Sequence, residues 1–129
     1  MELYEGLTVE LTAITGLTNK VFPATAPQGT KEPYLVYFLG GNERAKTLIA
    51  HDGLVESQYQ LDVYHSTYAL LYALKKLVIA EIKTWSQSSI GATGPYIQQV
   101  EIMTDFETYD NVLRLHKGIV EFNVHYTES

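Results

Sequence analysis

The chain has 129 residues, a length typical of one domain, and 46% of them are hydrophobic, which is enough to bury a core. Its net charge of −6 and nine scattered Lys and Arg argue against nucleic-acid binding, which needs clustered basic residues. The absence of Cys excludes disulfides and thiol chemistry. No signal-like or membrane-spanning apolar run is present, so we expect a soluble protein that folds in a cytoplasm.

The first predicted element is a helix over residues 2–15. Apolar side chains recur there at helical spacing, acidic residues occupy the first turn, and Gly16 is a suitable end. Residues 18–33 follow as a connector, because three prolines and a glycine punctuate them.

Residues 34–39 form a short apolar run rich in strand-forming types, which predicts a strand. Residues 40–53 begin and end with glycine and show no period, so we interpret them as a long loop between two strands. Two interpretations of its apolar residues, Leu48 and Ile49, remain open. They belong either to an interaction element that orders on binding or to an extension of the strand. The candidate contact residues of this loop are Arg44, Lys46, Leu48 and Ile49.

Residues 54–65 alternate between apolar and polar side chains, which predicts a half-exposed antiparallel strand. One face carries Val55, Tyr59, Leu61 and Val63. The other carries Glu56, Gln58, Gln60 and Asp62, and we take Glu56, Gln58 and Gln60 as candidate partner-contact residues.

The period then changes to that of a helix over residues 67–86, with Ser66 as the expected N-cap. Three lysines are expected on the exposed side of this helix: Lys75, Lys76 and Lys83. The expected apolar face comprises Leu70, Leu71, Leu74, Leu77, Val78, Ile82 and Trp85.

Two more strands are predicted, over 96–107 and 112–127, joined by a turn at 109–111. Along the last strand the alternation of apolar residues shifts by one position, from odd-numbered to even-numbered residues. This shift predicts a bulge at Lys117 and Gly118. The whole pattern indicates an α+β fold in the order α-β-β-α-β-β. We expect one domain over 1–129, with a single antiparallel sheet of about four strands and two helices packed on one face. The other face of the sheet is expected to be polar and available to partners.

No catalytic arrangement is predicted. The histidines at 51, 65, 116 and 125 lack metal-ligand spacing, and no nucleophile elbow or phosphate-binding loop occurs. The acidic residues of the strand over 96–107, Glu101, Asp105 and Glu107, indicate a solvated or partner-facing surface. We therefore expect no enzyme, no cofactor and no metal site.

Two stretches resemble the phage tail completion proteins. The first is Val21-Phe22-Pro23, then Ala26-Pro27-Gln28-Gly29, then Glu32-Pro33-Tyr34-Leu35-Val36-Tyr37. The second is Tyr59-Gln60-Leu61-Asp62-Val63-Tyr64, which leads directly into a helix. Together with the helices and the closing strands, the resemblance covers nearly the whole chain.

This resemblance implies a non-enzymatic subunit of the head–tail junction of a phage or prophage virion. Related tail terminators form hexameric rings, so the implied partners are further copies of the chain, the tail tube protein and a head–tail connector protein. No direct nucleic-acid recognition and no membrane partner are implied. The expected mechanism is capping: one face of the ring matches the last tube ring, and the other stops further addition.

Two alternatives remain. One is a head-side neck protein, an adaptor or stopper. The other is a small non-phage ligand- or RNA-binding α+β module, which the acidity and the lack of an aromatic, Gly-rich RNA signature disfavour.

Overall fold

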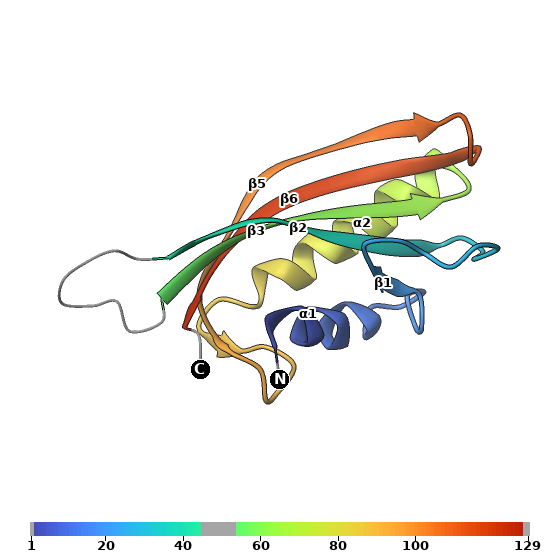
Figure 1. Ribbon diagram of the computed structural model, residues 1–129. Helices are drawn as coiled ribbons and strands as arrows, with labels where there is room; N and C mark the ends of the chain where they lie inside the picture. Colours follow the sequence, from blue (N-terminus) through green and yellow to red (C-terminus); the bar gives the residue numbers. More distant parts are fainter. Residues whose placement is uncertain (1, 45–53, 128–129) are drawn as a thin grey trace.

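The computed structural model describes residues 2–44 and 54–127, which form two helices and six strands (Figure 1). Their order along the chain differs from the predicted one, because a short strand precedes each pair of long strands. The elements are α1 (Leu3–Thr12), β1 (Val21–Pro23), β2 (Tyr34–Arg44), β3 (Leu54–His65), α2 (Tyr68–Lys83), β4 (Ser88–Ser89), β5 (Tyr96–Asp110) and β6 (Leu115–Thr127).

The six strands form one mixed sheet in the order β1-β2-β3-β6-β5-β4. β1 runs parallel to β2, and the other neighbours are antiparallel. The prediction of a single antiparallel sheet of about four strands was therefore wrong, although the class is α+β. β1 and β4 have three and two residues, too few to show a period of two, and β1 lies in the stretch 18–33 that we had assigned to a connector.

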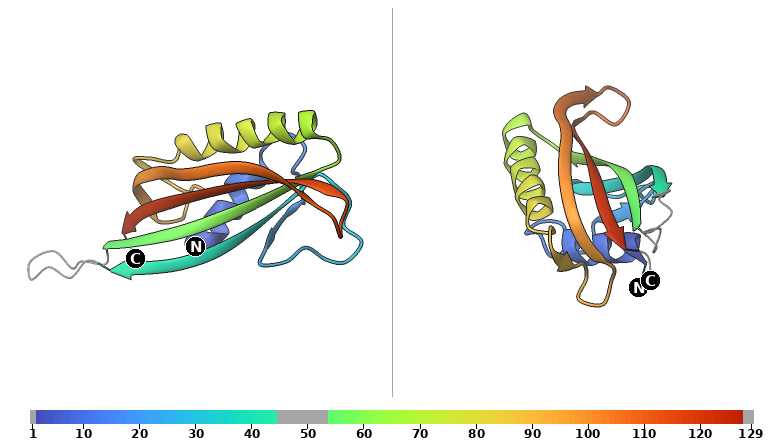
Figure 2. Two further views of the ribbon diagram at one scale, coloured as in Figure 1. Left: turned by 90° about the horizontal axis from the view of Figure 1, so that it is seen from above. Right: turned by 90° about the vertical axis from the view of Figure 1, so that its left-hand side faces the viewer.

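Both helices lie on the same side of the sheet and enclose the main core with it (Figures 1 and 2). α1 contributes Leu3, Leu7 and Leu11, and α2 contributes Leu71, Val78 and Ile82 among others. The core-facing residues of β3 are those predicted from its alternation: Val55, Tyr59, Leu61 and Val63. None of the described helices is long and apolar enough to span a membrane.

The helix ends differ slightly from prediction. α1 begins after Glu2, which forms a capping box with Glu5. α2 begins after Thr67 and not after Ser66, because the Thr67 hydroxyl accepts a hydrogen bond of 3.2 Å from the Leu70 amide.

The predicted faces of α2 need correction. Leu70 and Leu77 are each 49% exposed, whereas Lys75, expected on the exposed side, is only 3% exposed. The cause is the close approach of the helix to β6 at Gly118. A Cβ atom there would lie 3.2 Å from Cδ of Lys75, so the lysine stem packs over the glycine.

The bulge predicted at Lys117 and Gly118 is absent, because β6 pairs with β3 without a register shift from His116 to Thr127. The register shifts lie between β5 and β6, where Ile97/Gln99 and Ile102/Thr104 interrupt the pairing. The apolar residues of β6 change frame for another reason. Leu115, at the start of the strand, packs on the face of the sheet opposite the helices, whereas the later, even-numbered apolar residues face the main core.

β2 is longer than predicted. Residues 40–44 were assigned to the loop, but they continue the strand, and Arg44 pairs with Val55. A register shift between Leu39 and Gly41 lets β2 continue past its glycines. The rest of the predicted loop, 45–53, lies outside the described residues.

Candidate interaction surface

The face of the sheet that the helices leave uncovered carries the candidate residues of β3. Glu56, Gln58 and Gln60 follow one another along this central strand, so they form a row in the middle of the face. Arg44 lies at the end of the neighbouring strand β2. Lys46, Leu48 and Ile49 fall outside the residues that the structure describes.

The polar side chains of this row have partners within the sheet. Glu56 lies 3.4 Å from Nε2 of His125 on β6. The Gln60 amide donates a hydrogen bond of 2.9 Å to Oδ1 of Asp62, and Gln58 is exposed. This end of the open face is therefore polar.

Asp62 departs from the predicted pattern, because it is only 4% exposed. Its second carboxylate oxygen lies 3.5 Å from Nζ of Lys117 on β6, and the same ammonium group sits 5.8 Å from the ring centroid of Tyr64. The charge of Asp62 is therefore compensated by the Gln60 amide and by Lys117, as burial requires.

The opposite end of the open face is aromatic. Tyr34 of β2 stacks on Tyr64 of β3 with 4.7 Å between ring centroids, and both rings are buried together with Val36. Burial, reinforced by the carboxylates of Asp62 and Asp110, raises the pKa of Tyr64 to about 12. Burial also raises the pKa of Tyr34, and the charge that Tyr64 would carry beside it raises this pKa further. The face is thus not polar throughout, which corrects the prediction.

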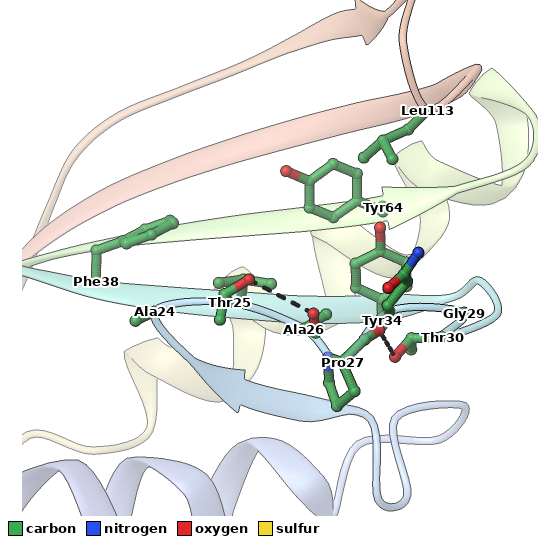
Figure 3. Close-up of a pocket in the computed structure, with 12 residues that line it drawn as sticks. Ala24, Thr25, Ala26, Pro27, Gly29, Thr30, Tyr34, Phe38, Tyr64 and Leu113 are labelled. Atoms are coloured by element: carbon green, nitrogen blue, oxygen red, sulfur yellow. Dashed lines mark hydrogen bonds between the residues drawn. The ribbon is translucent and has the colours of Figure 1, made fainter.

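A groove of about 310 Å³ runs over this aromatic end (Figure 3). Residues 24–30, between β1 and β2, form one wall, and Tyr34, Val36, Phe38 and Tyr64 form the floor. Leu113, from the turn between β5 and β6, closes it from the other side. The wall is held in shape by Thr30, whose amide and hydroxyl both donate to the carbonyl of Pro27 at 3.1 and 2.6 Å.

The groove brings together the two stretches that carry the sequence resemblance. Pro27 and Tyr34 come from the first, and Tyr64 comes from the second. This groove was not predicted from the sequence. One signal was present: Tyr64 interrupts the polar frame of β3, and an aromatic residue on a face expected to be solvated indicates a cover or a partner.

On the helix side, a charged cluster joins α2 to β5. Lys75 donates to Asp105 at 2.7 Å and to Glu107, and Glu107 also accepts from the Tyr68 hydroxyl at 3.1 Å. Burial acts to lower the pKa of Lys75, but its hydrogen bonds to the two carboxylates outweigh burial and raise it. Two of the three acidic residues predicted to be solvated or partner-facing thus bind a lysine of the same chain.

Comparison with known proteins gives a likeness of fold. A chain of the virion of a native gene transfer agent (GTA) particle aligns with a TM-score of 0.61 and 13% identity, over 97% of this chain and 91% of that one. A second solved structure, which bears no functional name, aligns with a TM-score of 0.54 and 13% identity, over 97% and 90%. No family model matches, and no curated protein matches.

Within residues 2–44 and 54–127, no group of three or more His, Asp or Glu is placed to hold a metal ion. His65 and His116 face each other across β3 and β6, whereas His125 pairs with Glu56. The open face instead offers stacked aromatic rings, a groove and paired charges, which suit recognition of another protein surface.

Proposed function

We propose that this chain is a structural subunit of a phage-like virion, which caps the head-proximal end of a long tail as a ring and joins it to the head. The observation that carries the proposal is the likeness to a virion chain of the gene transfer agent particle. It extends over almost the full length of both chains, so it is not limited to one common motif.

The sequence resemblance to the tail completion proteins supports the more specific role. Both of its stretches contribute residues to one groove on the open face, the second through Tyr64. In this proposal the partners are further copies of the chain in a hexameric ring, the tail tube protein and a head–tail connector. The proposed location is the head–tail junction.

Capping requires a ring with two unlike faces. A contact between neighbouring copies in a closed ring is heterologous, so each subunit presents two different patches. We propose the polar row Glu56, Gln58 and Gln60 as one contact surface. The second comprises Arg44 and the following segment, with Lys46, Leu48 and Ile49.

The proposal is tested by locating the protein in virions. Heads and tails are separated from a lysate of a strain that produces the particle, and the chain is detected in each fraction with an antibody. We expect the chain on tails, and tails of uncontrolled length in a strain that lacks the gene. Detection on heads with normal tails would contradict capping and would favour a head-side neck protein. Absence from both fractions would contradict a virion role altogether.

A further inference from the structure

One margin of the sheet has a vacant position beside β2. β1 ends at Pro23, which pairs with Tyr37, and among the described residues no strand continues beside β2 beyond that point. The Ala24 amide makes the last hydrogen bond, 2.9 Å to the Tyr37 carbonyl. Because backbone groups on one edge recur every second residue, Leu39 presents its amide and carbonyl to this vacant position.

An apolar pocket of about 380 Å³ adjoins the vacant position. Its walls are mostly aromatic or aliphatic, and three of the side chains are well exposed: Leu39 at 51%, Tyr4 at 49% and Phe38 at 37%. An open strand edge beside an apolar pocket has the two parts of a strand-addition site. The backbone groups supply hydrogen bonds, and the pocket accepts a side chain of the added strand. The lining residues are Tyr4, Pro23, Ala24, Tyr37, Phe38, Leu39 and Tyr59.

The other margin of the sheet is also open. β4 pairs with β5 only at Tyr96 and Ile97, so the described chain leaves most of the outer edge of β5 without a strand beside it. β5 contains no Pro and no Lys, the residues that most often protect an edge from pairing. It also exposes large apolar side chains, Met103 at 49% and Phe106 at 45%.

We propose that the β5 edge of one copy occupies the vacant position beside β2 of the next copy, with an apolar side chain of β5 in the pocket. The inference rests on the proposed ring and adds a backbone contact between neighbouring copies to the two side-chain patches proposed above. The two open edges lie at opposite margins of one sheet, so pairing β5 with β2 uses both of them at every contact, as a closed ring of identical subunits requires. Pairing of β5 with β5 would leave every β2 edge open.

The chain contains no Cys, so paired cysteines test this contact without background. Leu39→Cys is combined, one position at a time, with Cys at residues 99–109, and each variant is oxidised at high protein concentration. A disulfide requires Cα atoms about 4.4–6.8 Å apart, so strand pairing restricts cross-linking to one register. We expect a ladder of covalent oligomers at one or two positions of the scan. The single-cysteine variants, as matched controls, should give no ladder.

Three results would overturn the contact: no ladder at any position, equal yields along the whole scan, or dimers from single β5 cysteines, which would show β5 pairing with itself. A second measurement separates this contact from the ring itself. Leu39→Glu should abolish rings seen by electron microscopy on tails, whereas Val9→Glu, at a similarly exposed position on α1, should retain them. Rings that persist in Leu39→Glu would contradict edge pairing and leave the capping proposal standing.

Discussion

The buried hydroxyl of Tyr64 makes the stability of the fold depend on pH in the alkaline range. Its pKa is raised from 10.0 to about 12, because burial and the nearby carboxylates disfavour the phenolate. A folded-state pKa above the unfolded one stabilises the protein below the unfolded value. That contribution is lost as the pH rises from about 10 to about 12.

We therefore expect the wild-type protein to lose more free energy of unfolding than Tyr64→Phe between about pH 10 and pH 12. Denaturant unfolding at several alkaline pH values measures this difference. Tyr72→Phe, at a tyrosine that is 45% exposed, is the control and should follow the wild type. Equal losses in wild type and Tyr64→Phe would show that Tyr64 ionises as freely in the fold as in the unfolded chain.

Gly118 is required by contact with α2 and not by a bulge. An added Cβ would lie 3.2 Å from Cδ of Lys75 and 3.3 Å from Cδ1 of Leu71, so a branched side chain would push the helix away. We expect Gly118→Val to lower the free energy of unfolding by about 1–3 kcal/mol, the usual effect of overpacking. Thr108→Val, at an exposed position of β5, should change it by less than about 0.5 kcal/mol. If Gly118→Val left the free energy of unfolding unchanged, α2 would be able to move away from β6 without cost.

At the scale of elements, the contact between α2 and β5 is set by charge. The Lys75 stem crosses Gly118, and its ammonium group reaches Asp105 and Glu107 on β5. The pairing between β5 and β6 shifts register between Ile102 and Thr104, ahead of these carboxylates. The hydrogen bond from Lys75, offset in part by burial, lowers the pKa of Glu107. The ion pair between Lys75 and Glu107 therefore stabilises the folded state above pH 4.5. This stabilisation is lost as the pH falls through the lowered pKa of Glu107.

Lys75→Met keeps most of the buried stem and removes the charge. We expect a loss of about 1–2 kcal/mol in the free energy of unfolding at neutral pH, because charged hydrogen bonds to partly exposed carboxylates are lost. The loss should shrink in acid, as the pH falls through the lowered pKa of Glu107. Denaturant titrations at neutral and acid pH measure it, with the exposed Lys76→Met as the matched control. A loss that does not depend on pH would assign the effect to packing instead.

At the scale of the whole molecule, the sheet has two distant ends. The end of β2 and the start of β3 lie at one, and the turn between β5 and β6 lies at the other (Figure 1). The segment 45–53 joins Arg44 to Leu54 at the first end and carries Lys46, Leu48 and Ile49. If both apolar residues are buried against a partner, each contributes about 1.5–3 kcal/mol to the contact.

Under the proposed capping role, replacing residues 45–53 by a tight turn should leave Tm nearly unchanged and abolish capping. The replacement begins at 45, because Asn42, Glu43 and Arg44 pair with β3 and belong to the sheet. Thermal unfolding and an in vitro head–tail joining assay are measured together. A control with a Gly/Ser segment of the original length tests whether composition or length matters. Joining at the normal rate by the shortened protein would reduce the segment to a connector.

The sequence by itself determined the elements with a long, regular period. The alternation of 54–65 predicted β3 with its observed bounds and core face, and the helical spacing predicted the positions of α1 and α2. These patterns are local, because each side of a strand or helix meets the same environment along its length. The same reasoning located Glu56, Gln58 and Gln60 on the uncovered face.

Only the tertiary structure decided the features that depend on a distant neighbour. β1 and β4 are strands because β2 and β5 pair with them, and their own residues show no period. Lys75 is buried because Gly118 and the β5 carboxylates lie beside it. The groove exists because residues 24–30 fold over Tyr34 and Tyr64. In each case the free energy comes from a partner outside the element itself, which the period of that element does not record.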